Sequence, residues 1–582
     1  MANDMVNIQI NGMPLSVPKG STILEAARQA GINIPTLCYL KDINEIGACR
    51  MCVVEVKRAR SLVAACVYPV NEGMEIFTNT ERVRNSRKLS LELILSAHKR
   101  ECLSCVRSGN CELQKLCHDY GVEDEEHFKG EMPASTIDDT TGVIVRDNSK
   151  CVLCRRCSAA CSRQQAVGVI GVNDRGFDTH IGCVMDRDLK DVPCVSCGQC
   201  IVACPTGALH EKDETGKVWA ALADPSKHVI VNTAPSVRVT LGECFGMPVG
   251  TNVKGKMVSA LRRLGFAKVF DTDFSADLTI VEEANELVER IKNGGKLPMI
   301  TSCSPGWIKY CEYYYPEFLD NLSSCKSPQQ MFGAVAKTWY AKKMGIDPKD
   351  IFVVAVMPCT AKKFEAGRDN QAASGYPDID VALTTRELSR MIERAGLDFS
   401  ALPDEDFDLP LGASTGAGAI FGATGGVMEA ALRTAAETLT GKTLEKLEFN
   451  DVRGTEGIKE AKYKIGDLEL KVAVTSGLSN AKQLLENVKS GKSKYDFIEV
   501  MACPGGCVNG GGQPIQPANV RNNVDLKAIR GAALYAEDEN LPLRKSHENP
   551  SIKALYDEYL EKPGSHKAHE VLHTTYVARK KY

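Results

Sequence analysis

Three short segments in the second half of the chain combine cysteine with glycine, proline, methionine or lysine. They are Thr301-Ser-Cys-Ser-Pro-Gly-Trp307, Met357-Pro-Cys-Thr-Ala-Lys362 and Glu499-Val-Met-Ala-Cys-Pro-Gly-Gly-Cys507. Each segment supplies only one or two sulfurs, so any metal that they share must lie where the three segments meet. Thiolates are the ligands that iron–sulfur clusters prefer. The pattern therefore predicts a buried, reactive metal cluster.

A second group of cysteines forms an internal duplication in which a run of four recurs with the same internal spacing. In two-cluster ferredoxins, three closely spaced thiolates hold one [4Fe–4S] cluster and the fourth crosses to the other. This predicts one cluster on Cys151, Cys154, Cys157 and Cys204. It predicts a second on Cys194, Cys197, Cys200 and Cys161. Paired zinc ribbons are the disfavoured alternative, because they use two cysteines per knuckle.

Two further cysteine sets precede the duplication. The first consists of Cys38, Cys49, Cys52 and Cys66. Its pair two apart plus two outlying cysteines is close to the plant-type [2Fe–2S] pattern, although the spacing differs. The second consists of His98, Cys102, Cys105 and Cys111. Because three cysteines lack a fourth ligand, His98 is favoured as that ligand over a satisfied or exposed histidine. On chemistry alone, zinc would accept this second set equally well.

The totals limit the class of protein. A chain of 582 residues is too long for one core and predicts about four domains. Its 71 basic and 74 acidic residues are nearly balanced, so nucleic acid is an unexpected partner. The N-terminus lacks the pattern of a signal peptide, and no apolar run approaches the roughly 18 residues needed to span a bilayer. We therefore expect a cytoplasmic protein without a membrane span.

The 24 cysteines are better explained by metal than by disulfides in a reducing compartment. Cysteines two apart cannot easily bridge each other, yet they can converge on one metal centre. A secreted disulfide-rich protein is the disfavoured alternative. The cysteines without partners at metal spacing are expected to be buried structural thiols; they are Cys117, Cys183, Cys244, Cys311 and Cys325.

The elements that must position these residues change along the chain. Alternation over residues 6–10, the Asn11-Gly12 turn and residues 14–17 predict a hairpin. A capped helix is predicted over residues 23–30, ending at Gly31. Residues 83–100 predict a helix that ends in His98, and the Ser-, Thr-, Asp- and Pro-rich stretch 133–149 predicts a linker.

From about residue 213, short β-rich runs alternate with helical segments, which predicts α/β layering. The runs are residues 229–233, 299–301, 351–357, 472–474 and 497–501. Two cysteine segments, 301–307 and 357–362, fall just past a strand's carboxyl end, where open α/β sheets bind ligands. The glycines of residues 412–429 are not spaced as a dinucleotide fingerprint, so close packing is their expected use. Beyond Pro517 the chain is charged and is expected to be helical and exposed.

The three late segments resemble the signature loops of the iron-only ([FeFe]) hydrogenases, and the resemblance covers nearly the whole chain. It implies a multidomain fold: a β-grasp [2Fe–2S] ferredoxin-like domain (1–80), a histidine-ligated [4Fe–4S] domain (81–120) and a two-[4Fe–4S] ferredoxin domain (140–212). An α/β catalytic domain (213–516) and a helical small-subunit-like C-terminal segment (517–582) would follow. The first two modules also resemble those of the large cluster-bearing subunit of respiratory complex I, which favours iron at His98.

The resemblance implies an H-cluster, in which a [4Fe–4S] cubane is linked through one cysteine to a di-iron unit. That unit carries CO, cyanide and a bridging dithiolate with an amine. The implied reaction is 2H+ + 2e− ⇌ H2. Cys359, Cys503 and Cys507 match the cubane ligands, with Cys507 bridging to the di-iron unit. Lys362 and Ser236 match the contacts to cyanide. Met357 and Met501 match the apolar packing around the di-iron unit.

The chain departs from the family at one pair. The family has two adjacent cysteines in its first loop, of which the first passes protons and the second ligates the cubane; here the pair is Cys303-Ser304. Strict alignment makes Cys303 the proton carrier and Ser304 an alkoxide ligand. Iron–sulfur chemistry prefers thiolate, so by chemistry Cys303 would ligate and Ser304 would take protons less well. On chemistry, the expectation leans slightly to ligation by Cys303.

The implied reaction also needs a proton path to a buried site. Glu283 and Glu286 lie three apart on the helical stretch 279–292 and share one face. A solvated acidic face is the ordinary interpretation of this pattern alone. The two residues resemble the glutamates of the family's proton relay, and Ser323 matches its serine. Positioned carboxylates within hydrogen-bond reach provide such a transfer.

Electrons must reach the site singly, so the upstream clusters are predicted to be a conduit of one [2Fe–2S] and three [4Fe–4S] clusters. The sequence contains no flavin or nicotinamide motif, and electrons are therefore expected from ferredoxin or from a flavoprotein subunit that uses NAD(P)H in a hetero-oligomer. One alternative is a complex I-like electron-transfer subunit, which would leave Cys359, Cys503 and Cys507 unused. Another is a low-turnover H2 sensor or assembly protein, to which Ser304 gives some weight.

Overall fold

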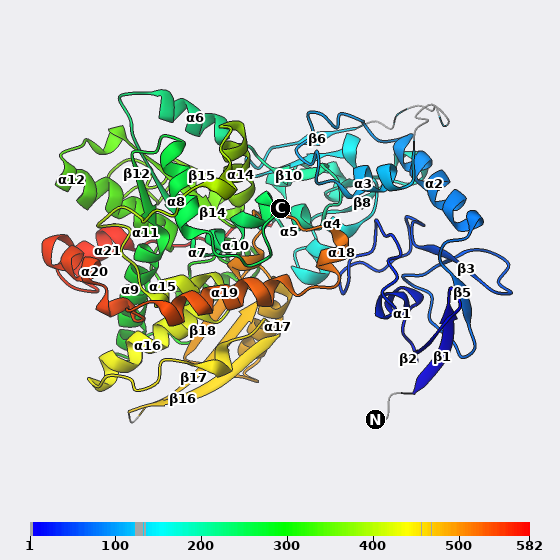
Figure 1. The fold of residues 1–582 in the computed structure, drawn as a ribbon. Coiled ribbons are helices and arrows are strands. Elements are labelled where there is room, and N and C mark those ends of the chain that lie inside the picture. Colours follow the sequence, from blue (N-terminus) through cyan, green and yellow to red (C-terminus); the bar gives the residue numbers. More distant parts are fainter. Residues whose placement is uncertain are drawn as a thin grey trace.

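The computed structural model describes residues 4–122, 128, 132, 135–455, 457–466 and 468–581. A large α/β body carries a set of smaller N-terminal modules on one side (Figure 1). The body is green to red in Figure 1 and the modules are blue to cyan. Within the described ranges, every helix is too short or too polar to cross a bilayer.

The first module is a five-stranded sheet in the order β2-β1-β5-β3-β4. Strands β1 (Met5–Ile10) and β2 (Met13–Pro18) form the expected hairpin, with Asn11 and Gly12 at positive φ in the turn. Strands β3 (Val53–Val56), β4 (Val63–Ala64) and β5 (Glu75–Phe77) complete it. Helix α1 (Ile23–Gln29) begins with a capping box between Thr22 and Glu25, so its predicted start is confirmed.

Helices α2 (Glu81–Leu95) and α3 (Glu112–Asp119) form the next module. The prediction of a helix ending in His98 was wrong at its end, because α2 stops at Leu95 and His98 lies in the turn that follows. This places His98 off the helix, on the short connection that leads to Cys102.

The prediction of a linker over residues 133–149 was also wrong for most of its length; residues 133–134 lie outside the described part. Strands β6 (Ile137–Asp138) and β7 (Ile144–Asp147) pair with β10 (Leu209–Glu211) in a three-stranded antiparallel sheet. The polar composition hid two buried residues, Ile144 and Val145, and a buried ion pair between Arg146 and Asp138.

The duplicated cysteines lie around two short helices, α4 (Arg156–Ala159) and α5 (Gln199–Ala203). The first helix continues as a π-helical turn, η2 (Ala160–Gln164), because no proline follows Cys161. The second ends at Ala203, and Cys204, the residue before Pro205, is already extended. The hairpin of β8 (Gly171–Asn173) and β9 (His180–Gly182) connects the two repeats.

Two four-stranded sheets form the frame of the large body. In the first, β12 (Lys268–Asp271), β11 (His228–Thr233), β14 (Ile351–Met357) and β15 (Val381–Thr384) are all parallel. In the second, β13 (Met299–Ile300), β18 (Phe497–Met501) and β17 (Leu468–Ser476) are parallel, and β16 (Ile458–Ile465) is antiparallel to β17. The expected strands therefore exist, and helix α9 (Thr272–Lys292) packs against α11 (Pro328–Val335) and α16 (Gly426–Thr440).

The glycine-rich stretch allows close packing, as expected. A Cβ atom on Gly416, in α15 (Gly416–Ala419), would come 2.0 Å from an Asp538 carboxylate oxygen, and one on Gly422 would come 2.4 Å from Leu534. Both partners lie on α19 (Leu526–Asn540), which runs along the body in Figure 1. The glycines thus let this C-terminal helix dock directly on backbone.

The C-terminal segment is helical as expected, but the prediction of exposure was wrong. Helices α19, α20 (Pro550–Leu555) and α21 (His566–Leu572) bury their apolar faces, and Leu555, Leu560 and Leu572 belong to the same core as the first sheet. The charged residues misled the sequence interpretation because several of them form buried ion pairs, such as Arg530 with Glu243.

Candidate active site

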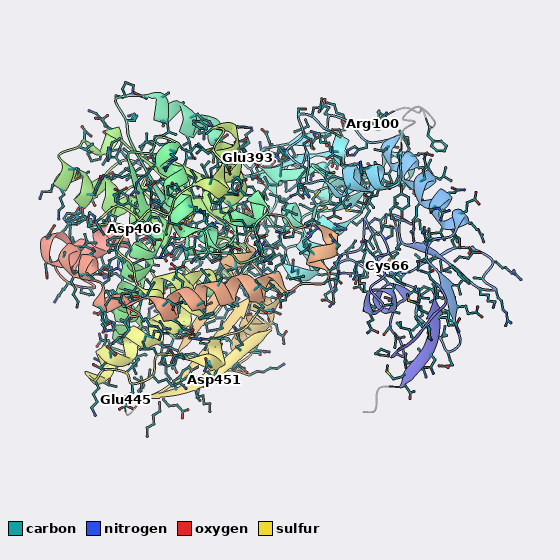
Figure 2. The ribbon with its side chains drawn as sticks, in the orientation of Figure 1. Cys66, Arg100, Glu393, Asp406, Glu445 and Asp451 are labelled. Carbon is teal, nitrogen blue, oxygen red and sulfur yellow. The ribbon has the colours of Figure 1, made fainter. Side chains whose placement is uncertain are left out.

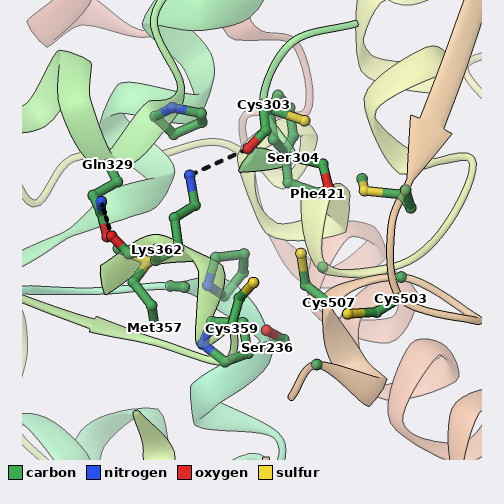
Figure 3. A pocket seen from close by; sticks show the side chains of 18 of the residues that line it. Ser236, Cys303, Ser304, Gln329, Met357, Cys359, Lys362, Phe421, Cys503 and Cys507 are labelled. Atoms are coloured by element: carbon green, nitrogen blue, oxygen red, sulfur yellow. Dashed lines mark hydrogen bonds between the residues drawn. The ribbon is translucent and has the colours of Figure 1, made fainter. Parts of the chain in front are cut away.

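A single cavity collects the three cysteine segments at the carboxyl ends of the parallel strands, where α/β sheets bind ligands (Figure 3). Strand β14 ends at Met357 and β18 ends at Met501. The cavity is lined by sequence-predicted residues from both sheets, namely Ser236, Cys303, Ser304, Met357, Cys359, Lys362, Met501, Cys503 and Cys507.

The thiols of this cavity lie close together: Cys503 is buried, and Cys303, Cys359 and Cys507 are half-buried where they face the cavity. A side-chain hydrogen bond joins Cys359 and Cys503; it lowers the pKa of Cys359 and raises that of Cys503. Burial raises the pKa of Cys507 to about 12, and the nearby Cys359 adds to the effect. Thiols that must ionise together in an apolar cavity require a bound cation to stabilise them. The donor set therefore fits an iron–sulfur cluster.

Polar atoms of the cavity wall also point to a bound group. The hydroxyl of Ser236, on α7 (Pro235–Arg238), is buried and has no hydrogen-bond partner in the described part of the chain. The side-chain oxygen of Gln329 is in the same condition. Buried polar atoms are usually paired, so these two fit a ligand with its own donors and acceptors. Met357, Met501 and Phe421 supply apolar lining of the same cavity.

Lys362 is held rigidly at the edge of the cavity. It lies on α13 (Ala361–Ala366), and its ammonium donates to the Cys303 carbonyl at 3.2 Å (Figure 3). It also donates to Ser327 at 2.8 Å and to Glu365 at 2.8 Å. Gln329 donates to the Lys362 carbonyl at 3.2 Å. A positive donor fixed in this way suits an anionic ligand atom.

Cys303 and Ser304 face different neighbours. They precede α10 (Pro305–Tyr314), and the Ser304 hydroxyl accepts a hydrogen bond from the Ala502 amide at 3.2 Å, next to Cys503. Burial raises the pKa of the Cys303 thiol, and among the surrounding charges Glu283 has the largest effect on it. Ser304 therefore lies on the side of Cys503, a predicted cubane ligand, and the thiol of Cys303 lies near the predicted proton relay.

The structure also brings the relay residues together on one face of α9. Burial and the nearby Glu286 carboxylate raise the pKa of Glu283 to about 8. The Ser323 hydroxyl donates to Glu286 at 2.9 Å, and Arg290 holds the other carboxylate oxygen of Glu286 at 2.6 Å. Glu283 is fully buried and Glu286 is only partly buried. The order from cavity to surface is therefore Cys303, Glu283, Ser323 and Glu286.

The upstream cysteines gather as their spacing predicted. The sulfurs of Cys52 and Cys66 lie 3.3 Å apart, and the amides of Cys38 and Cys49 each donate to the other's sulfur. A separate small cavity is lined by one complete predicted set, Cys151, Cys154, Cys157 and Cys204. Burial raises the pKa of Cys200, and Cys197, Cys194 and Cys161 add to the effect, so the second set is also close together.

The histidine-containing set has weaker geometric support. Burial raises the pKa of Cys111 and the nearby Cys105 adds a small effect, while the Nδ1 atom of His98 is buried without a partner in the described residues. This set is joined to the duplicated module by Arg107, which donates to the Cys204 carbonyl at 3.1 Å. A Cβ atom on Gly207 would come 2.5 Å from the Cys105 sulfur. Two cluster loops thus pack directly against each other.

A contact that the sequence analysis missed joins the duplicated module to the cavity. A Cβ atom on Gly198, which follows Cys197, would come 2.4 Å from the Thr360 hydroxyl and 2.9 Å from the Gly511 Cα. A Cβ atom on Gly511 would come 2.3 Å from the Cys197 carbonyl. The lack of a Cβ atom at Gly198 and Gly511 allows the two segments to come this close. The contact places Cys197 beside Cys359, which precedes Thr360. The Cys-Gly pair was the available signal, but only the fold shows its partner.

A second missed residue is Lys309, which lies on α10, the helix that follows Cys303 and Ser304, and contacts the duplicated cysteine module. Its ammonium lies 3.3 Å from the Ser196 hydroxyl, between Cys194 and Cys197, and 3.9 Å from the centre of the Phe364 ring. Burial lowers the pKa of Lys309 to about 8, and the largest opposing effect comes from Cys194.

We expect Lys309→Met to lower the potential of the cluster on Cys194, Cys197, Cys200 and Cys161, on the order of tens of millivolts. A cation nearby stabilises the reduced, more negative cluster, so its removal favours the oxidised form. Potentiometric titration followed by electron paramagnetic resonance measures the shift. Lys309→Arg keeps the charge and serves as the control. Equal potentials in the Met variant and the wild type would contradict the assignment.

Comparison with protein families gives matches along most of the chain. A model described as the iron-only hydrogenase large subunit, C-terminal domain, matches residues 227–511. One described as the iron hydrogenase small subunit matches residues 524–579. A 2Fe-2S iron-sulfur cluster binding domain matches residues 3–81, and an NADH-ubiquinone oxidoreductase-G iron-sulfur binding region matches residues 87–126.

Whole proteins match as well. The NADP-reducing hydrogenase subunit HndD of Solidesulfovibrio fructosivorans is 50% identical, over 99% of this chain and 100% of that protein. Iron hydrogenase 1 of Clostridium pasteurianum is 46% identical, over 98% of this chain and 100% of that protein. A solved apo [FeFe]-hydrogenase from Chlamydomonas reinhardtii has a TM-score of 0.55 at 44% identity, and the match covers 62% of this chain and 98% of that one.

Proposed function

Since the chain belongs to the iron-only ([FeFe]) hydrogenase family, we propose that it interconverts protons and H2 in the cavity lined by its three cysteine segments. The observation that carries the proposal is the convergence of Cys359, Cys503 and Cys507 with Lys362 around one apolar, buried space. Such a space excludes water and strengthens every electrostatic contact to a bound group.

The residues of the cavity fit an H-cluster. Cys359, Cys503 and Cys507 would hold its cubane, and Cys507 would also bridge to the di-iron unit. Lys362 and the unpartnered Ser236 hydroxyl would donate to cyanide ligands, while Met357 and Met501 pack around them. When bound, the H-cluster supplies the redox-active iron at which protons and electrons combine. The protein's own part is to hold, orient and protect that group.

The contacts of the Cys303-Ser304 pair favour the roles that follow from strict alignment. We assign the proton-carrying role to Cys303, because its half-buried side chain lines the cavity and, among the surrounding charges, Glu283 has the largest effect on the pKa of its thiol. We assign the fourth cubane position to Ser304, whose hydroxyl lies beside Ala502 and Cys503. The slight expectation that Cys303 ligates rested on thiolate chemistry alone; the contacts on each side of the pair weigh against it.

Protons would pass between Cys303 and the surface through Glu283, Ser323 and Glu286. With its raised pKa, Glu283 keeps a proton at neutral pH and can donate it toward the thiol. Ser323 can accept from Glu283 and donate to Glu286, to which it already donates at 2.9 Å. Glu286 is the first member of the row with access to solvent.

Electrons would pass through four upstream clusters, one [2Fe–2S] and three [4Fe–4S]. The direct contacts of Arg107 with Cys204 and of Gly198 with Gly511 support an unbroken order from the N-terminal modules to the cavity. The domain limits that we propose are those expected from the sequence. The name of the relative HndD includes NADP reduction, so flavoprotein subunits that use NAD(P)H in a hetero-oligomer are the proposed partners, with ferredoxin as a further donor.

Infrared spectroscopy of the protein matured with its di-iron unit tests the proposal, together with H2 evolution from a strong reductant. We expect bands of metal-bound CO and cyanide and sustained H2 production. If the bands are absent while the upstream clusters are intact, a complex I-like electron carrier is left. If the bands are present but almost no H2 forms, a low-turnover sensor is left; Ser304 is the residue that favours this second candidate.

A further inference from the structure

A pair of histidines joins the surface to the last glutamate of the relay. His569 is exposed on α21, and the centre of its ring lies 4.0 Å from that of His573, which follows the helix. The side chain of His573 is only 7% exposed. One ring is thus in contact with solvent, and the other points into the body.

Buried His573 is fixed by hydrogen bonds at both ring nitrogens. Its Nδ1 lies 2.8 Å from the Ser324 hydroxyl, and its Nε2 lies 3.2 Å from a Glu282 carboxylate oxygen. The backbone adds to this order, because His573 forms an isolated antiparallel bridge with Cys325. Glu282 also accepts from the hydroxyl of Tyr556 and from the Gly564 amide. The ring therefore has one fixed orientation.

His573 lies beside the carboxylate oxygen of Glu286 that Arg290 does not hold. A ring nitrogen of His573, the sulfur of Cys325 and a carboxylate oxygen of Glu286 all lie within 4.8 Å of one another. Because Nδ1 is bonded to the Ser324 hydroxyl, the route from the ring toward Glu286 runs through that hydroxyl. The Ser324 amide, whose own hydroxyl binds His573, donates to Glu286 at 3.1 Å. No other described residue is needed to connect the imidazole with the relay.

The bonding of Glu286 shows which of its oxygens can exchange protons. Arg290 donates to Oε1 from two nitrogens, at 2.6 and 3.1 Å, and a guanidinium does not release its proton in proteins. Ser323 donates to Oε2, and Cys325 approaches the same atom at 3.8 Å. Proton exchange is therefore directed to Oε2, on the side of Ser323, Ser324 and Cys325.

We propose that His569 and His573 act as a proton-collecting pair that loads and unloads Glu286. This deepens the proposed function and rests on it. Imidazole both accepts and releases protons near neutral pH, which suits a surface collector. The titratable groups around the pair are Glu282, Glu286 and Glu289 on α9, together with Cys325 and Tyr556. Burial and the neighbouring His573 lower the pKa of His569, and the carboxylates of Glu282, Glu286 and Glu289 partly oppose this, so the exposed ring readily releases a proton that it collects.

The test measures H2 production by the full matured chain at low and at high buffer concentration. In low buffer we expect His569→Gln and His573→Gln to lower turnover severalfold, less than the roughly 10²-fold low end for loss of a general acid or base. Imidazole or concentrated buffer should restore the turnover of both variants, because a small acid in solution replaces the missing collector. His566→Gln, an exposed histidine on the same helix, is the matched control and should stay unchanged.

Two results would overturn the proposal. One is an unchanged turnover of His569→Gln in low buffer. The other is a loss in His573→Gln that neither buffer nor imidazole restores and that comes with a lower melting temperature, which would make His573 structural. The wild-type protein in the same assay reports the proposed function separately: that function fails if wild-type turnover or the infrared bands are missing, whereas the histidine pair is judged from ratios to the wild type.

Discussion

Glu283→Gln should lower H2 production by about 10²- to 10⁴-fold, the range for loss of a positioned acid or base. The side chain keeps its size and its burial, so the cavity and its infrared bands should be unchanged. A glutamine cannot pass a proton between Cys303 and Ser323, and Glu283 is the carboxylate with the largest effect on the pKa of that thiol. Turnover with a strong reductant and infrared spectra of the same sample measure both effects.

The pH dependence provides a second readout for Glu283. Its pKa is raised to about 8, so it is protonated below that pH and ionised above it. H2 production by the wild type should therefore fall as the pH rises through about 8. The residual activity of the glutamine variant should not show that step. Glu445→Gln, an exposed glutamate outside the relay (Figure 2), is the control and should behave like the wild type. Near-normal turnover in Glu283→Gln would remove this residue from the proton path.

Ser304→Cys should increase retention of the cubane, since a fourth thiolate replaces a hydroxyl at an iron–sulfur site. Iron content after a challenge with a chelator, and the electron paramagnetic resonance signal of the cubane, measure that gain. Cys303→Ala should leave the cubane in place and lower turnover by about 10²-fold or more, because it removes only the proton carrier.

The two variants also separate the alternatives for the pair. If Cys303 were the ligand, Cys303→Ala would lose the cubane, and the double variant Cys303→Ala, Ser304→Cys would regain it. Ser304→Ala shows whether the hydroxyl binds iron at all, because it removes the oxygen with little change in volume. Loss of the cubane in Cys303→Ala, with full retention in Ser304→Ala, would reverse our assignment.

Patterns that act over a few residues were predictable from the sequence. The hairpin before Pro18, the strands that end at Met357 and Met501, and the division of the duplicated cysteines all follow from local spacing. The end of α2 and the strands between residues 137 and 147 were missed, because a few buried residues in a polar stretch decide them.

Contacts between distant segments could not be predicted in the same way. In the sequence, Lys309 is one lysine of a helix, and only the fold shows that Ser196 and Phe364 contact it. His573 is a histidine near a chain end until a bridge to Cys325 aligns it with α9. Charge and polarity suggest exposure for both residues, and only burial by other segments gives them a role.

The meeting of Gly198 with Gly511 has a consequence for how such chains can be rearranged. Because Gly198 lies against the Thr360 hydroxyl and the Gly511 Cα, and Gly511 lies against the Cys197 carbonyl, the proposed electron transfer across this junction depends on the absence of a Cβ atom at both positions. The N-terminal iron–sulfur modules could therefore be exchanged for those of another hydrogenase, provided that both glycines are kept at the junction. A methyl group on either glycine would push the two segments apart and slow the proposed electron transfer.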